Sequence, residues 1–180
     1  MKFLKKVGLF AALSVCCATN PVHASVCGVN LSVGVEVSAV APLFRVTNES
    51  EEWEIESLTF DLAPAVSELI FDIADAGRFE IVNLPEPSQV RLAQTMTSPD
   101  MQQLQIDFDP FSSNDVFMFR IALSDALSVE DGFRPQVLDL EGAGLYFTVT
   151  RGDAVEVLVL NFDSAGVAAA ETESCTDTTG

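Results

Sequence analysis

The chain has almost no histidine or lysine, and the few that it has lie at one end. His23 is the single histidine, and the three lysines are Lys2, Lys5 and Lys6. Beyond residue 24, no Ser-His-Asp or Cys-His nucleophile system, imidazole metal site, lysine Schiff base or P-loop can therefore form. A Gly-x-Ser-x-Gly elbow and a Gly-rich dinucleotide loop are also missing. Because these absences exclude the commonest catalytic systems, we predict a non-catalytic protein.

Residues 1–24 are typical of a signal peptide. The three lysines precede an apolar run from Val7 to Ala18, and Val22-His23-Ala24 suits a signal peptidase. A lipid anchor at Cys16 or Cys17 is the alternative, but a valine stands where a lipobox has Gly, Ala or Ser. We expect cleavage after Ala24 and secretion to the extracellular space or the periplasm. No membrane insertion is expected, since no later run approaches the ~20 apolar residues of a spanning helix.

Positive charge is scarce in residues 25–180. Six arginines stand against 27 acidic residues, so six minus 27 gives a formal net charge of −21. Such a surface repels phosphate backbones and anionic membranes, which argues against nucleic acid as a partner. It suits cation binding, or an unidentified surface, glycan or basic protein partner.

Only two cysteines remain after residue 24, and they stand near the two ends of the mature chain. An oxidising compartment favours joining Cys27 to Cys175, and two free thiols are the alternative. The bridge would close nearly the whole domain and stabilise it by about 5 kcal/mol at most.

The dominant hydrophobic period is two, which predicts half-buried β-strands. Alternating apolar residues occur at 31–37, 104–108, 117–123, 145–149 and 155–159, where Val155, Val157 and Val159 supply the last set. Together with the turns between them, they predict an all-β fold with little helix. We expect an antiparallel β-sandwich of immunoglobulin or jelly-roll type with eight or nine strands. A single domain over 25–168 would precede an acidic tail, 169–180, that Cys175 tethers.

Two local departures from this pattern are expected. In WEIESLTFDL, Trp53 and Ile55 share one face while Leu58, Phe60 and Leu62 share the other, which predicts a bulge near Glu56-Ser57. Only SDALSVEDGF (124–133) and the Ala-rich SAGVAAAETES (164–174) could hold a helical turn, apart from one turn at most in PAVSELIFDI (64–73).

Acidic residues gather in the loops, where calcium would find oxygen ligands. The candidate ligands are Asp107, Asp109, Asn114 and Asp115 around one loop, and Asp125, Glu130 and Asp131 in the next connection. A third cluster is Asn48, Glu49, Glu51 and Glu52. None has EF-hand spacing, and solvated turn acids that keep strand edges unpaired are the alternative interpretation. Calcium is therefore the only cofactor predicted.

Two further motifs offer alternatives. Arg151-Gly152-Asp153 lies where a hairpin tip belongs, and it matches both an integrin-type docking tripeptide and an ordinary turn. A pair of carboxylates could also serve a polysaccharide-active enzyme, although one Trp and one Tyr give little to hold sugar rings. We predict no catalytic residues.

Four segments resemble a loose group of exported bacterial β-rich proteins labelled "aggregation factor core". They are Val46-Thr47-Asn48, Leu58–Leu62, Leu69–Asp72 and Gly142–Thr150, within residues 44–150. The resemblance implies a surface or matrix sandwich and supplies no catalytic residues. This chain does not show the C-terminal Pro-Glu-Pro sorting signal that many such proteins have, because its Pro85-Glu86-Pro87 lies in mid-chain. The function expected is therefore cell-surface or matrix adhesion, with a carboxylate enzyme or a subunit of an exported assembly as alternatives.

Overall fold

The computed structural model describes residues 26–37, 41–72, 79–86, 89–92, 102–126 and 134–175. The predicted signal peptide lies outside these residues, as do Glu130 and Asp131. The described residues form twelve β-strands, all paired antiparallel, and one short 3-10 helix, η1 (Val137–Leu140). The all-β prediction is confirmed. The count of eight or nine strands is wrong, because strands of three to five residues are too short to show a period.

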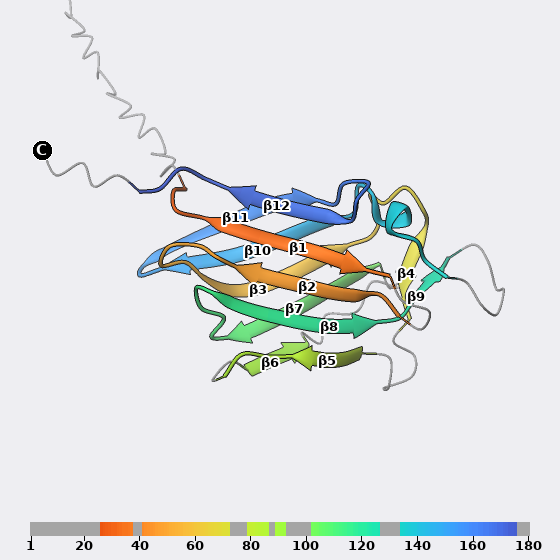
Figure 1. Ribbon diagram of the computed structural model, residues 1–180, viewed down its shortest axis with the longest axis horizontal. Coiled ribbons are helices and arrows are strands. Elements are labelled where there is room, and N and C mark those ends of the chain that lie inside the picture. Colours follow the sequence, from red (N-terminus) through yellow and green to blue (C-terminus); the bar gives the residue numbers. More distant parts are fainter. Residues whose placement is uncertain are drawn as a thin grey trace, which may run out of the picture.

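The strands form two five-stranded sheets and one short pair. Sheet A has the order β12-β1-β2-β8-β5, and sheet B has the order β11-β10-β3-β7-β6. Figure 1 shows the two sheets as two layers, with the β4–β9 pair at one end. Sheet A contains β1 (Asn30–Glu36), β2 (Leu43–Asn48), β5 (Phe79–Asn83), β8 (Asp115–Ile121) and β12 (Val167–Glu171); sheet B contains β3 (Glu54–Asp61), β6 (Gln89–Leu92), β7 (Gln103–Asp109), β10 (Gly144–Arg151) and β11 (Ala154–Asn161); the pair is β4 (Leu69–Phe71) with β9 (Leu123–Asp125).

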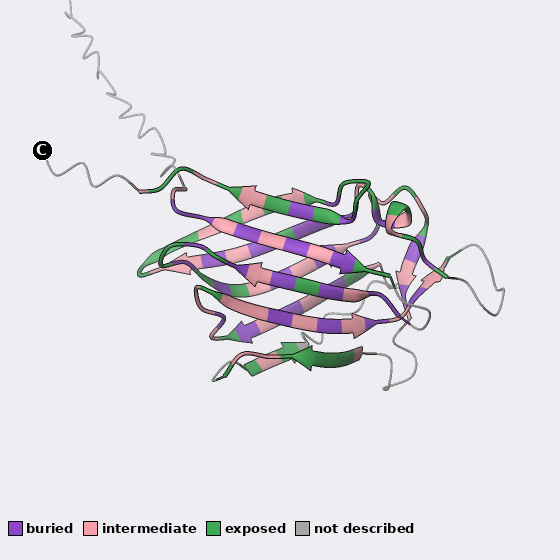
Figure 2. Cartoon of the chain, in the orientation of Figure 1, coloured by how far each residue is buried: buried purple, intermediate pink, exposed green. Residues whose placement is uncertain are grey.

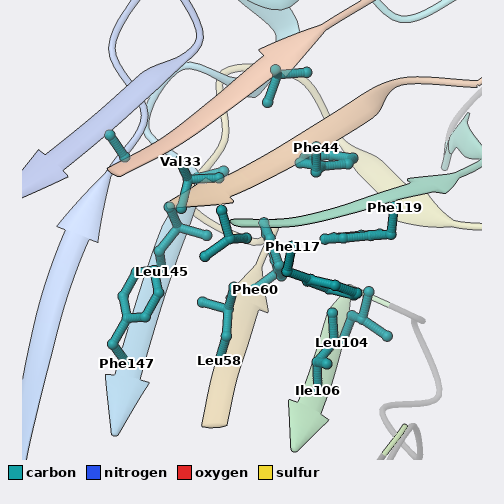
Figure 3. Packing of buried hydrophobic residues seen from close by; sticks show 14 of the residues in the cluster. Val33, Phe44, Leu58, Phe60, Leu104, Ile106, Phe117, Phe119, Leu145 and Phe147 are labelled. Atoms are coloured by element: carbon teal, nitrogen blue, oxygen red, sulfur yellow. The ribbon is translucent and has the colours of Figure 1, made fainter. Parts of the chain in front are cut away.

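One hydrophobic core joins both sheets. Buried residues alternate along the central strands (Figure 2), as the period of two requires. Phe44 of β2 and Phe119 of β8 stack at 5.1 Å, and both meet Phe60 of β3 edge to face, at 5.3 and 5.7 Å. Figure 3 shows these rings from the two sheets packed together. Since the contacts cross from sheet A to sheet B, neither sheet can bury its apolar face without the other.

The predicted bulge is confirmed on β3. Ser57 pairs with Thr148 of β10 and Ile55 pairs with the next residue, Val149, so Glu56 is the extra residue. The bulge lets Ile55 and Leu58 both reach the core despite their odd spacing, and both are buried. It therefore restores the correct face after the phase change seen in the sequence.

Two predictions about the C-terminal end need correction, and one about residues 124–133 is only partly covered by the structure. The Ala-rich segment forms β12 rather than a helical turn, because it pairs with β1 and buries Ala168. β12 also reaches Glu171, so residues 169–171 of the predicted tail belong to a strand. Of the other proposed helical segment, Ser124 and Asp125 lie in β9 and residues 127–133 are outside the described part.

Candidate binding surface

A disulfide closes one end of the molecule. Cys27, just before β1, is bonded to Cys175, just after β12; the two are 148 positions apart in the sequence, and their Cα atoms are 5.0 Å apart. The predicted bridge is therefore present. The backbone N–H of Gly28 also donates to the carbonyl of Glu173 at 2.7 Å, so the two chain ends run together beyond the sheet.

The arginine of the Arg-Gly-Asp motif belongs to this disulfide end. The motif forms the tip of the β10–β11 hairpin, as predicted, with Gly152 at φ +59°. The Arg151 guanidinium lies 4.7 Å from the centre of the Trp53 ring, and its Nη1 is 2.8 Å from Cys175 Sγ. Trp53 in turn donates its Nε1–H to the carbonyl of Cys27 at 2.8 Å. The arginine thus has structural partners, and the tripeptide does not present it as a free ligand.

Asn48, at the end of β2, is a buried linker between three segments. Its amide nitrogen donates to the carbonyls of Trp53 at 2.8 Å and Phe111 at 3.4 Å. Its side-chain oxygen accepts from the Ser50 N–H at 3.1 Å. Because its side chain is buried and its polar atoms are satisfied, Asn48 holds loops together and is not available as a metal ligand.

The loop between β7 and β8 packs on the same end. Its Phe111 is fully buried and accepts from the Ile55 N–H, the Asn114 N–H donates to the Asn48 carbonyl, and the Ser113 hydroxyl donates to the Ser50 carbonyl. Asn114 adopts φ +66°, a left-handed conformation that asparagine tolerates. The loop and the segment after β2 are joined by hydrogen bonds between residues 63 positions apart, and therefore form one structural unit.

The predicted calcium ligands are dispersed. Asp107 and Asp109 lie on the outer face of sheet B, Asp115 accepts from the Ser112 N–H at 3.0 Å, and Asp107 accepts from Gln105 at 2.8 Å. Asp125 lies on β9, which Figure 1 places at the opposite end of the molecule from the β7–β8 loop. Glu130 and Asp131 lie outside the described residues. Within the described ranges, no three acidic, cysteine or histidine residues are grouped so that they could hold a metal ion.

Calcium binding stays a prediction that thermal unfolding can test. Suppose that a site such as the Asp109–Asp115 loop has a dissociation constant of one-hundredth of the free calcium concentration. Calcium then stabilises the native state by about 2.7 kcal/mol. For a domain of this size, that corresponds to a rise in melting temperature of roughly 5–10 °C relative to EDTA. Magnesium is the control, because its octahedral preference suits an open loop poorly. An unchanged melting temperature in calcium would reject the prediction.

A second feature is the exposed apolar face at the border of sheet B. Val155, Val157 and Val159 of β11 are 60%, 61% and 56% exposed. The sequence period suggested that these valines face the core, and that is wrong. Leu158 and Leu160 take that place, opposite Phe147 and Leu145 of β10, and pack against the core.

The exposed face continues from β11 onto the next two strands. Val159 pairs with Tyr146, which pairs with Thr59, and Val157 pairs with Thr148, which pairs with Ser57. Because directly paired residues point to the same side of a sheet, these side chains form two adjacent rows. We call the residues Ser57, Thr59, Tyr146, Thr148, Val155, Val157 and Val159 the valine–hydroxyl face. None of these seven residues is charged, although residues 25–180 carry a net charge of −21. Carboxylates border the face, because Asp107 of β7 pairs with Ser57, and Glu54 of β3 pairs with Thr150, the partner of Val155.

Sequence reasoning missed this face because the core-facing and solvent-facing residues of β11 are both aliphatic. In AVEVLVLN one polar residue falls on each parity, Glu156 with the leucines and Asn161 with the valines, so either set could have faced the core. One signal could have decided it. Leucine is the larger side chain, and the two leucines share one parity while the three valines share the other.

The four segments of the resemblance lie in strands or beside them. Val46-Thr47-Asn48 is in β2, and Leu58–Leu62, Leu69–Asp72 and Gly142–Thr150 overlap β3, β4 and β10. Most of their apolar positions are core positions, which many antiparallel proteins share. No helix among the described residues has the length and hydropathy to cross a membrane. Comparison with known proteins gives no matching family model and no significant match to a curated protein or a solved structure.

Proposed function

We propose that this protein is an exported, non-catalytic β-sandwich that binds another surface in cell-surface or extracellular-matrix adhesion. The sandwich assignment is supported by two five-stranded antiparallel sheets that share one phenylalanine-rich core. Export is supported by the N-terminal sequence and by a disulfide, which is typical of oxidising compartments.

The valine–hydroxyl face is the observation that carries the binding proposal. Val155, Val157 and Val159 are each more than half exposed. Burying their side chains against a partner would be favourable, because it would remove apolar surface from water. Apolar patches bordered by polar residues are typical of interaction sites. Tyr146, 37% exposed, adds the residue type that is enriched where proteins bind one another.

The charge distribution narrows the class of partner. A surface crowded with carboxylates repels acidic partners, so electrostatic repulsion is weakest where charged residues are absent. The valine–hydroxyl face offers flat apolar area and hydroxyl groups side by side. It therefore fits an uncharged partner surface, such as a matrix protein or a neutral glycan.

Binding by mature protein immobilised on beads tests the proposal. Wild type is expected to retain cells, purified matrix proteins or neutral glycans, and Thr148→Lys is expected to weaken that binding about tenfold. Thr148 lies inside the face, between Val157 and Ser57, so a lysine there places a desolvated charge against the partner.

Val66→Lys is the matched control, since Val66 is 72% exposed but lies in the turn between β3 and β4. It should bind like wild type. Equal melting temperatures of the three proteins would show that the fold is intact. A protein that binds nothing in this panel, or a Thr148→Lys variant that binds as well as wild type, would contradict the proposal.

A further inference from the structure

We propose that the free edge of β11 pairs with β11 of a second copy, antiparallel, about a two-fold axis at Val157. The inference rests on the proposed function in one respect, because it names a partner for the border of the valine–hydroxyl face. Its evidence is the backbone edge, its charge and its register.

β11 is the longest edge strand of the two large sheets. It has eight residues, whereas the other edges, β12, β5 and β6, have five, five and four. All eight residues of β11 pair with β10 in unbroken register, and no described strand pairs with its other side. β12 lies beside it in Figure 1 but belongs to the other sheet and pairs with β1.

β11 has one inward-facing charge, Glu156 opposite the buried Val149, but otherwise lacks the devices that keep edge strands apart. Natural edges are protected by brevity, bulges, proline or charge. β5 has Glu80 and a register break, and the four-residue β6 has Arg91. The only charged residue of β11 is Glu156.

Geometry and charge select one register for a symmetric pair. A two-fold axis perpendicular to the sheet requires paired residues to point to the same face, so the axis must pass through a residue position. An axis at Glu156 would oppose two carboxylates. An axis at Leu158 would leave Val155 opposite Asn161.

An axis at Val157 places each of the three exposed valines opposite another valine. It pairs Val157 with Val157 of the second copy, and Val155 with Val159 in both directions. Glu156 then lies opposite Leu158, so no like charges meet directly. The result is a continuous ten-stranded sheet whose outer face carries six valines across the junction, and whose formation satisfies backbone groups that water otherwise solvates.

Charge-swap variants test this register by sedimentation velocity. Wild-type mature protein is expected to dimerise, and more tightly at high salt because screening reduces the repulsion between two acidic copies. Val157→Lys and Val157→Glu should each weaken the dimer about tenfold or more, since like charges would then face each other at the axis. An equal mixture of the two variants should restore a dimer.

The same test distinguishes the register from any other. Mixing Val155→Lys with Val159→Glu should restore the dimer, whereas mixing Val155→Lys with Val155→Glu should not. Val167→Lys, on the exposed edge of β12, is the matched control and should dimerise like wild type.

Two results would overturn the inference: a monomeric wild type at high protein and salt concentration, or a dimer that Val157→Lys leaves intact. Bead binding without self-association would reject this inference and leave the proposed function standing. Self-association without bead binding would reject the proposed function and leave this inference standing.

Discussion

Replacing Cys27 and Cys175 together by alanine is expected to lower the free energy of unfolding by about 3–5 kcal/mol. The bridge joins residues 148 positions apart, so it restricts almost the entire unfolded chain. Domains of this kind are typically stable by about 5–15 kcal/mol, so the loss would be a large share of the total. The variant would also lack the Cys175 sulfur that lies 2.8 Å from Arg151 Nη1.

Urea unfolding of the oxidised wild type and of the double variant measures this effect. The slope of the free energy against urea should increase in the variant, because an unbridged unfolded chain exposes more surface. Dithiothreitol is the control. It should bring the wild type to the stability of the variant and leave the variant unchanged. A difference below about 1 kcal/mol would show that the bridge only fastens loose ends.

Asn48→Asp is expected to destabilise the protein by about 3 kcal/mol or more at pH 7. The substitution keeps the shape but replaces the amide that donates to the Trp53 and Phe111 carbonyls by a carboxylate that can only accept. The site is fully buried, so the new charge would have no compensating partner. The segment after β2 and the β7–β8 loop would each lose the hydrogen bond that the Asn48 amide donates to it.

The same variant should recover stability on acidification. Burial and two facing carbonyl oxygens raise the pKa of the introduced carboxyl in the folded state above its unfolded value of about 3.9. The folded state then binds the proton more tightly, so the deficit is full above the raised pKa and shrinks as pH falls through it. Asn161→Asp, on the exposed end of β11, is the control and should show a small effect without this pH dependence. A deficit that stays constant from pH 7 to about pH 4 would refute the assignment of Asn48 as a buried donor.

Local patterns in the sequence predicted local features of the fold. The alternation in NLSVGVE and QLQIDFD predicted β1 and β7, and the phase change in β3 predicted the bulge at Glu56. These features depend only on neighbours within a few residues, because side chains of a strand alternate between two faces. The same reasoning failed for the Ala-rich β12, where pairing with β1 outweighed the helix preference of alanine.

The candidate surfaces depended on contacts between distant segments. No spacing in the sequence indicated that Asn48 would link the segment after β2 to the β7–β8 loop, or that Arg151 would lie over Trp53. The acidic residues around 107–115 were recognised as a group, but strand pairing directed them to different partners and faces. A side chain's partner is set by which strands are neighbours, and alternation carries no information about strand order.

By itself, the sequence determined an acidic all-β chain with a signal-peptide-like start and a hairpin at residues 151–154. It also determined a disulfide between Cys27 and Cys175, the only two cysteines after residue 24. Composition and short-range periodicity suffice for these, because they concern single residues, near neighbours or the one pair that remains. Only the tertiary structure decided the strand order, the burial of Asn48 and the exposure of the β11 valines. Both parities of β11 are aliphatic, so its orientation follows from which set fits the core formed by the other strands. Leucines opposite Leu145 and Phe147 fill that core, and the valines stay exposed on the outer face of sheet B.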